Sequence, residues 1–138
     1  MEKKTFIGKH SELTDKLIGA FYDVYNELGY GFSEKVYENA LVIVLRKLGL
    51  NVEQQSPITV YFADQVIGGF VVDLLVEDKI ILELKSVKSL NDQHEAQLFN
   101  YLKATKIEVG LLLNFGPKAE FKRRVYDNER KGSLSWVK

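Results

Sequence analysis

The sequence predicts an α/β protein with two helices, three antiparallel strands, a crossover helix and a final buried strand. Two observations carry this prediction. Apolar residues recur at a helical period up to Gly49, and the period then changes to two. After the predicted strands, a third helical segment at residues 93–104 precedes another apolar run. This order is typical of a crossover to a parallel strand. We expect one domain over residues 1–138, close to the commonest domain size.

Two apolar stripes with a 3.6-residue period predict the first two helices. The first follows Ser11, a candidate N-cap, and is stopped by Gly29 and Gly31. The second follows Ser33, another candidate N-cap, and stops at Gly49. Stripes of this kind are usually core, and we interpret both as core.

The rest of the chain is predicted as strands around one helix. Pro57 is expected at a bulge or an edge break, because proline cannot donate to a sheet ladder. The crossover should place the last strand parallel to one of the first three. Extended segments are expected at residues 52–62, 66–76, 80–85, 107–114 and 121–126, with turns at 63–65 and 77–79, the helix at 93–104 and a polar tail at 127–138.

Composition excludes several classes of function. The chain has no cysteine, which removes disulfides, thiol catalysis and cysteine-bound zinc. No apolar run approaches the roughly 18 residues that span a bilayer, and residues 1–6 lack the apolar core of a secretory signal. We therefore expect a cytoplasmic protein without a membrane partner. The 19 basic and 19 acidic residues balance, which argues against a general polyanion binder.

Basic residues nevertheless gather late in the chain. A solvated face is the usual role of such a run. The alternative is a local basic groove that binds substrate through Lys122, Arg123 and Arg124. The full set is Lys118, Lys122, Arg123, Arg124, Arg130 and Lys131.

The candidate catalytic residues lie in the most apolar part of the chain. Asp73 sits in one apolar strand, and Glu83-Leu84-Lys85 ends the next. A turn centred on Asp78 would pair position 73 with position 83, whereas a turn shifted by one residue would not. Facing carboxylates in an apolar wall repel unless a divalent cation joins them, and oxygen ligands suit Mg²⁺ or Mn²⁺. The alternative is a structural ion pair between Glu83 and Lys85 or a neighbour.

Other polar residues are expected near these carboxylates. The Lys85 ammonium can stabilise charge that develops on a scissile phosphate. Glu34, in the first turn of the second helix, could face a metal or merely complete that helix terminus, and Glu38 shares its face. Gln97 and Tyr101 share one face of the crossover helix, where they could bind a phosphate or simply form its polar surface. His94, on the same face, is interpreted as structural.

Short motifs occur in order along the chain at residues 31–37, 38–41, 73–76, 83–85, 97–103 and 110–116. Together they resemble the GxxExxY family, a branch of the PD-(D/E)XK nuclease superfamily. The resemblance covers about residues 11–126 and departs from the superfamily name only in the valine that precedes Asp73. It implies a restriction-endonuclease-like α-β-β-β-α-β core with a mixed four-to-six-stranded sheet, flanking helices and an extra N-terminal helix.

The resemblance also implies roles for the site residues. Asp73 and Glu83 would be metal ligands, with the Leu84 carbonyl as a possible third. Glu34 would be a further acidic ligand or would hold a metal-bound water. Lys85 would be the catalytic lysine. Gln97 and Tyr101 match a QxxxY motif that orients substrate or site.

The leading functional hypothesis is a Mg²⁺- or Mn²⁺-dependent nuclease that acts on DNA in preference to RNA. The main alternative is a non-catalytic module of the same fold that binds a protein or nucleic acid. A hydrolase of a small phosphorylated metabolite is a third class and would need an enclosed pocket. A homodimer could form through an exposed edge strand or the first helix.

Overall fold

The computed structural model describes residues 8–138. Residues 1–6, on which the expectation of no secretory signal rests, lie outside this part. Within it, no helix is both long and apolar enough to cross a membrane. The elements, in chain order, are α1 (Ser11–Leu28), α2 (Glu34–Lys47), β1 (Val52–Phe62), β2 (Gln65–Val76), β3 (Ile80–Lys85), α3 (Asp92–Ala104), β4 (Val109–Phe115), β5 (Ala119–Val125) and a 3₁₀ helix (Asn128–Arg130).

The strands form one five-stranded mixed sheet in the order β1-β2-β3-β4-β5. β1, β2 and β3 pair antiparallel, α3 then crosses over, and β4 lies parallel to β3. β5 returns antiparallel to β4. The predicted α/β class, the order of the elements and the parallel final crossover are confirmed.

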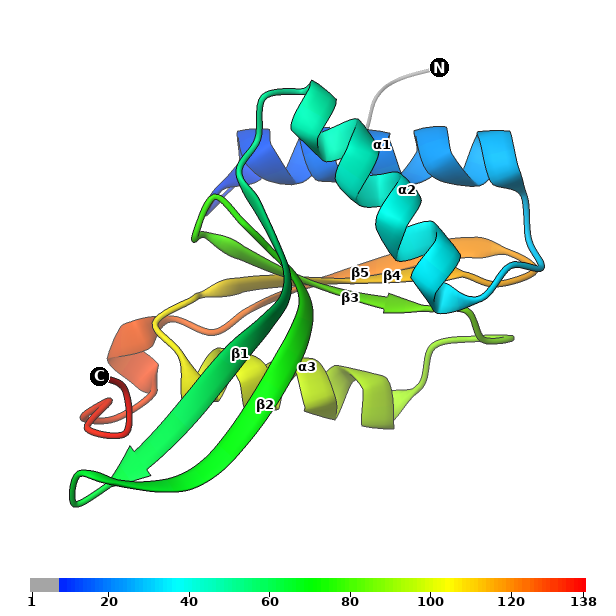
Figure 1. Cartoon of the computed structure of the whole chain (residues 1–138). Coiled ribbons are helices and arrows are strands. Elements are labelled where there is room, and N and C mark those ends of the chain that lie inside the picture. The colour runs from blue at the N-terminus through cyan, green and yellow to red at the C-terminus, as the bar shows by residue number, and fades with distance from the viewer. Residues whose placement is uncertain (1–7) are drawn as a thin grey trace.

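Helices cover both faces of the sheet (Figure 1). α1 and α2 pack on one face, where Leu74, Leu82 and Leu84 belong to the larger apolar cluster. α3 packs on the other face, where Ile81 and Leu112 meet Leu98 and Tyr101. The helix approaches the sheet closely because Gly110 on β4 has no side chain, and a Cβ there would lie 2.6 Å from Leu98 Cδ1.

The β1–β2 hairpin bends where the predicted site begins. Val72 packs in the α3 cluster, but Leu74, two residues on, packs in the α1/α2 cluster. Regular alternation would put both residues on one face, so it is broken around Asp73. On β1 the irregularity falls at Gln55, which has a φ of 54° and lies between residues that pair with Leu74 and Val72. The outer hairpin therefore projects from the sheet beside α3 (Figure 1).

Two local predictions differ from the structure. Ser11 is not an N-cap, because α1 starts at Ser11 itself and His10 occupies the cap position in a left-handed conformation. Pro57 is not at a bulge, since it pairs in register with Val71, and the register shift lies at Val60/Tyr61. Pro57 does lie on an edge strand, where a missing N–H costs no ladder bond.

The C-terminal segment packs against the hairpin and α3. The Trp136 indole N–H donates to the Lys103 carbonyl at 2.8 Å, and the Trp136 carbonyl accepts from the Tyr61 N–H at 3.0 Å. Lys131 is 1% exposed and donates to the carbonyls of Thr105 and Ile107 just beyond α3. Burial lowers the pKa of Lys131 to about 8.

Candidate active site

Asp73 and Glu83 lie side by side where β2 and β3 part. The ladder between these strands stops at Leu74 and Leu82, a register that would next pair position 73 with position 83. Beyond this pair, the carboxylates of Asp73 and Glu83 accept main-chain N–H groups that carbonyls would accept in a regular ladder. A Glu83 carboxylate oxygen accepts the Asp73 N–H at 3.0 Å, and an Asp73 oxygen accepts the Leu84 N–H at 2.8 Å. Each carboxylate is thus fixed against the other strand.

This arrangement is electrostatically costly for the protein alone. Glu83 is 4% exposed, and burial followed by the charge of Asp73 raises its pKa to about 8. Burial is also the largest cause of the raised pKa of Asp73, and the charge of Glu38 adds to it. A buried carboxylate beside a partly buried one of the same sign favours protonation of one of them or the arrival of a cation.

Lys85 and two residues of α3, Gln97 and Tyr101, lie near the two carboxylates. The Lys85 ammonium donates to the Gln97 side-chain carbonyl at 3.2 Å. Tyr101, one turn further along α3, is nearly buried, and its pKa is raised by burial and then by the charges of Glu83 and Asp73. His94, by contrast, accepts the Asn91 N–H through Nδ1 in a capping box, which makes it a structural residue of the α3 terminus.

Glu38 approaches Asp73 through a glutamine pair that the sequence did not single out. The Glu38 carboxylate is 4% exposed and accepts from the side-chain amides of Gln54 and Gln55 and from the Lys35 ammonium. The Gln55 amide also reaches Asp73 Oδ1 at 3.5 Å. The signal available in the sequence was a pair of adjacent amides in a segment that should alternate polar and apolar residues.

Glu34 is exposed in the first turn of α2 and lies near enough for its charge to raise the pKa of Glu83. Its carboxylate accepts no hydrogen bond from residues 8–138. Tyr37, the last residue of the motif that contains Glu34, is fully buried instead. Its ring stacks on Phe115 with centroids 4.4 Å apart, and its hydroxyl donates to the Gly29 carbonyl. One motif therefore supplies both an exposed acid and a core residue.

The late basic residues do not form one surface. Lys122 and Arg124 both pair with Glu95 of α3, at 3.1 Å for the lysine. Arg123, which alternates with them on β5, donates to the Lys9 carbonyl at 2.6 Å. Lys131 is buried away from both groups. A role of Lys122, Arg123 and Arg124 in substrate binding stays a prediction, and it would require them to exchange these contacts.

The donor set at the site fits a hard divalent cation. Glu83 Oε2 accepts no hydrogen bond from residues 8–138, so this oxygen is available to a cation. Within the same residues no group of three or more histidine, cysteine or acidic side chains lies close enough to hold a metal by itself. Mg²⁺ is typically bound by one or two carboxylates, with waters and substrate phosphates completing its coordination.

A five-stranded mixed sheet with helices on both faces and two carboxylates at its parting strands defines the restriction-endonuclease-like class. The chain belongs to the PD-(D/E)XK nuclease superfamily, whose family model matches residues 11–125. Members of this superfamily generally use divalent metal ions. The narrower assignment to the GxxExxY branch stays a prediction from the motifs.

A solved structure shares the fold. The protein in the crystal structure of SSO0001 is 20% identical in sequence to this chain. The two structures match with a TM-score of 0.56, and the match covers 91% of this chain. The match spans 63% of the SSO0001 chain, so the two proteins are similar in fold but differ in extent. No curated protein matches the sequence.

Proposed function

We propose that this protein is a Mg²⁺-dependent nuclease that hydrolyses phosphodiester bonds, in DNA rather than RNA. The observation that carries the proposal is the juxtaposition of Asp73 and Glu83 with Lys85, which is itself held by Gln97. The membership of the PD-(D/E)XK superfamily supports the same reaction class.

In this proposal the Asp73 and Glu83 carboxylates and the Leu84 carbonyl would hold the ion. Glu34 would act through a metal-bound water, because no three acidic side chains of residues 8–138 lie close enough to share one ion. When bound, the ion lowers the pKa of water and polarises a phosphoryl oxygen. The Lys85 ammonium stabilises negative charge on the phosphate, and Gln97 orients that ammonium. Tyr101 and Gln97 contribute to substrate binding from α3, and Lys122, Arg123 and Arg124 contact more distant phosphates.

Isothermal titration calorimetry tests the metal site by measuring the binding of Mg²⁺ and Mn²⁺ to the wild type, Asp73→Ala and Glu83→Ala. Asp23→Ala is the control, because the exposed Asp23 side chain on α1 makes no hydrogen bond or ion pair with residues 8–138. Binding in the wild type and Asp23→Ala that is lost in the two site variants is expected. Cleavage of fluorescent single- and double-stranded DNA and RNA, with EDTA as a blank, then tests the reaction. Ion-independent cleavage, or cleavage retained in Glu83→Ala, would refute the assignment.

A second candidate is a non-catalytic module that binds a protein or nucleic acid. The pairing of Lys122 and Arg124 with Glu95 favours it, because these cations are already engaged within the molecule. This candidate predicts a binding partner that is retained by Lys85→Ala and needs no divalent ion.

A further inference from the structure

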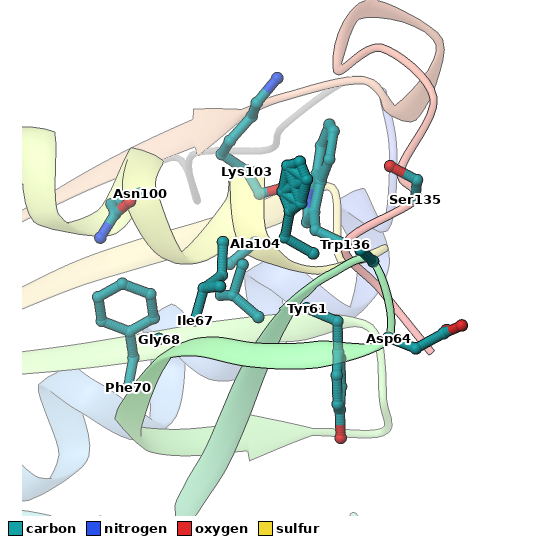
Figure 2. Close-up of a pocket in the computed structure, with 13 residues that line it drawn as sticks. Tyr61, Asp64, Ile67, Gly68, Phe70, Asn100, Lys103, Ala104, Ser135 and Trp136 are labelled. Atoms are coloured by element: carbon teal, nitrogen blue, oxygen red, sulfur yellow. The ribbon is translucent and has the colours of Figure 1, made fainter.

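A pocket of about 760 Å³ lies beside the proposed active site. It opens between the outer β1–β2 hairpin, the C-terminal half of α3 and the segment around Trp136 (Figure 2). Ligand sites typically have volumes of about 300–1,000 Å³ and mostly apolar walls with a few polar groups. The size and position of this pocket therefore suit a bound molecule.

The walls combine aromatic rings with isolated polar groups. Phe62 and Ile67 on the hairpin are 63% and 65% exposed, although both are large and apolar. Figure 2 shows Phe70 and Asn100 at one end of the pocket and Trp136 beside Lys103 further along. The Asn100 amide makes no hydrogen bond with residues 8–138 and is exposed, so it is available to a ligand.

A cation lies over one of these rings. The Lys103 ammonium is 4.7 Å from the Trp136 ring centroid. Flat rings, a positive charge and a free amide are the groups that protein sites use to bind nucleobases. A nucleobase combines a flat face for the rings with a polar edge for the Asn100 amide, whereas an apolar side chain would use the rings alone.

The pocket and the carboxylates are connected through β2 and α3, since Phe70 and Asn100 line the pocket on these two elements. Phe70 precedes Asp73 by three strand residues, a distance of about 10 Å along the strand. The Phe70 ring lies 5.6 Å from the Tyr101 ring, centroid to centroid. Asn100 follows Gln97 by three positions on α3, so the two lie on adjacent parts of one helix surface. A strand whose phosphate reaches Lys85 would have a neighbouring nucleotide at the pocket.

We propose that the pocket holds one unpaired nucleobase of the strand whose phosphate lies at Asp73 and Glu83. This inference rests on the proposed nuclease function and narrows its substrate class. A base within a duplex has both faces stacked and cannot enter without leaving the helix. The site therefore favours single strands, frayed ends or extruded bases over intact duplex.

Binding of a fluorescein-labelled thymidine 12-mer, followed by anisotropy in EDTA to prevent cleavage, tests this. Phe62→Ala is the main variant, because its exposed ring adds little to folding. Phe70→Leu keeps apolar volume but removes an aromatic face. Ile43→Ala, an equally exposed apolar residue on the outer side of α2, is the matched control. Thermal melts confirm that each variant is folded.

Both aromatic variants should bind the single strand about 5- to 150-fold more weakly than the wild type, the range expected for one lost base stack. Ile43→Ala should bind as the wild type does. An abasic position moved along the 12-mer should weaken wild-type binding at one position and have no effect on the Phe62→Ala variant. The same DNA as a blunt duplex should bind more weakly than the single strand.

The two proposals fail separately. If the wild type cleaves DNA with Mg²⁺ but Phe62→Ala and Phe70→Leu bind single strands normally, the nucleobase site is refuted and the nuclease stands. If single strands bind with the expected aromatic dependence but no nucleic acid is cleaved, the nuclease is refuted and the base site stands. No binding of the 12-mer to the folded wild type refutes the base site directly, and an apolar protein segment then becomes its occupant.

Discussion

Asp73 and Glu83 are joined by reciprocal contacts between side chain and main chain. Glu83 accepts the Asp73 N–H, and Asp73 accepts the N–H of Leu84, the residue after Glu83. These bonds continue the β2–β3 pairing past the last ladder pair, Leu74 and Leu82, with carboxylates in place of carbonyls. The site is consequently part of the sheet's own hydrogen bonding, and its position is set by the same register that forms the core.

The stability of the metal-free protein should fall as pH rises from about 4.5 to about 8. The pKa of Glu83 is raised from 4.5 to about 8, so the native state holds a proton there that the unfolded chain releases. The stabilisation is complete below pH 4.5 and is lost as pH rises through 8. Asp73, whose pKa is also raised, adds in the same direction.

Glu83→Gln should remove most of this slope, because a neutral amide keeps an acceptor oxygen for the Asp73 N–H. We expect the variant to exceed the wild type by a few kcal/mol at pH 8 and to approach it at pH 5. Urea unfolding in EDTA at four pH values measures the difference, with Glu12→Gln on α1 as control. Destabilisation of Glu83→Gln by about 3–5 kcal/mol at pH 8 would instead identify a structural ion pair.

Lys85→Ala should lower the cleavage rate by about 10²–10³-fold, the usual effect of removing one group that stabilises developing charge. Gln97→Ala should have a smaller effect, about 10–100-fold, because it removes only the acceptor that orients the ammonium. The decrease should fall on kcat with KM little changed. Steady-state cleavage with Mg²⁺ at varied substrate concentration measures both, and Lys16→Ala on the exposed side of α1 is the matched control. Equal activity in Lys85→Ala and Lys16→Ala would remove Lys85 from the mechanism.

The two acids of α2 should behave differently. Glu38→Ala removes the acceptor that the amides of Gln54 and Gln55 share, and leaves them only Asn39 Oδ1 at 2.7 Å and Asp73 Oδ1 at 3.5 Å. This loss should cost about 1–3 kcal/mol in the free energy of unfolding. Glu34→Ala removes an exposed acid and should change stability by less than about 0.5 kcal/mol. It should, however, weaken Mg²⁺ binding, since the Glu34 charge acts on Glu83. Urea unfolding and calorimetry on the same samples separate these effects, and the opposite assignment would follow if only Glu38→Ala altered metal affinity.

Local sequence signals predicted the features that local geometry determines. The sequence predicted a short turn at residues 77–79 but left two registers open, and the structure has the one centred on Asp78, which brings Asp73 and Glu83 together. The hydrogen bond from the Gln55 amide to Glu38 could not be predicted from the sequence. It depends on the left-handed conformation of Gln55 and on the bend of the hairpin. The pairing of Lys122 with Glu95 joins residues 27 positions apart, and such contacts are set by how α3 docks on the sheet.

The C-terminal segment shows the same limit. Residues 127–138 have few apolar positions and were predicted as a polar tail, yet Trp136 binds Lys103 and contacts the hairpin. A single tryptophan gives no periodicity, so its partner surface could not be inferred from pattern alone. The pocket that Trp136 lines therefore could not be predicted from the sequence.

Two glycines should respond in opposite ways to alanine. A Cβ at Gly116 would lie 1.9 Å from the Val87 carbonyl oxygen, a main-chain atom that cannot move without the loop after Lys85. The buried Asn114 holds this loop, since it accepts the Val87 N–H at 3.0 Å and donates to the Val87 carbonyl at 2.9 Å. Gly19, within α1, has no atom within 4 Å of the position of an added Cβ.

Gly116→Ala should therefore cost about 2–4 kcal/mol, because the clash displaces the loop and breaks the Asn114 bonds. It should also reduce cleavage, since Lys85 lies at the start of the displaced segment. Gly19→Ala should stabilise the protein by about 0.5–1 kcal/mol through helix propensity, with cleavage unchanged. Urea unfolding and the cleavage assay on both variants provide the test. A Gly116→Ala protein as stable as the wild type would mean that the loop moves freely and that Asn114 does not anchor the site.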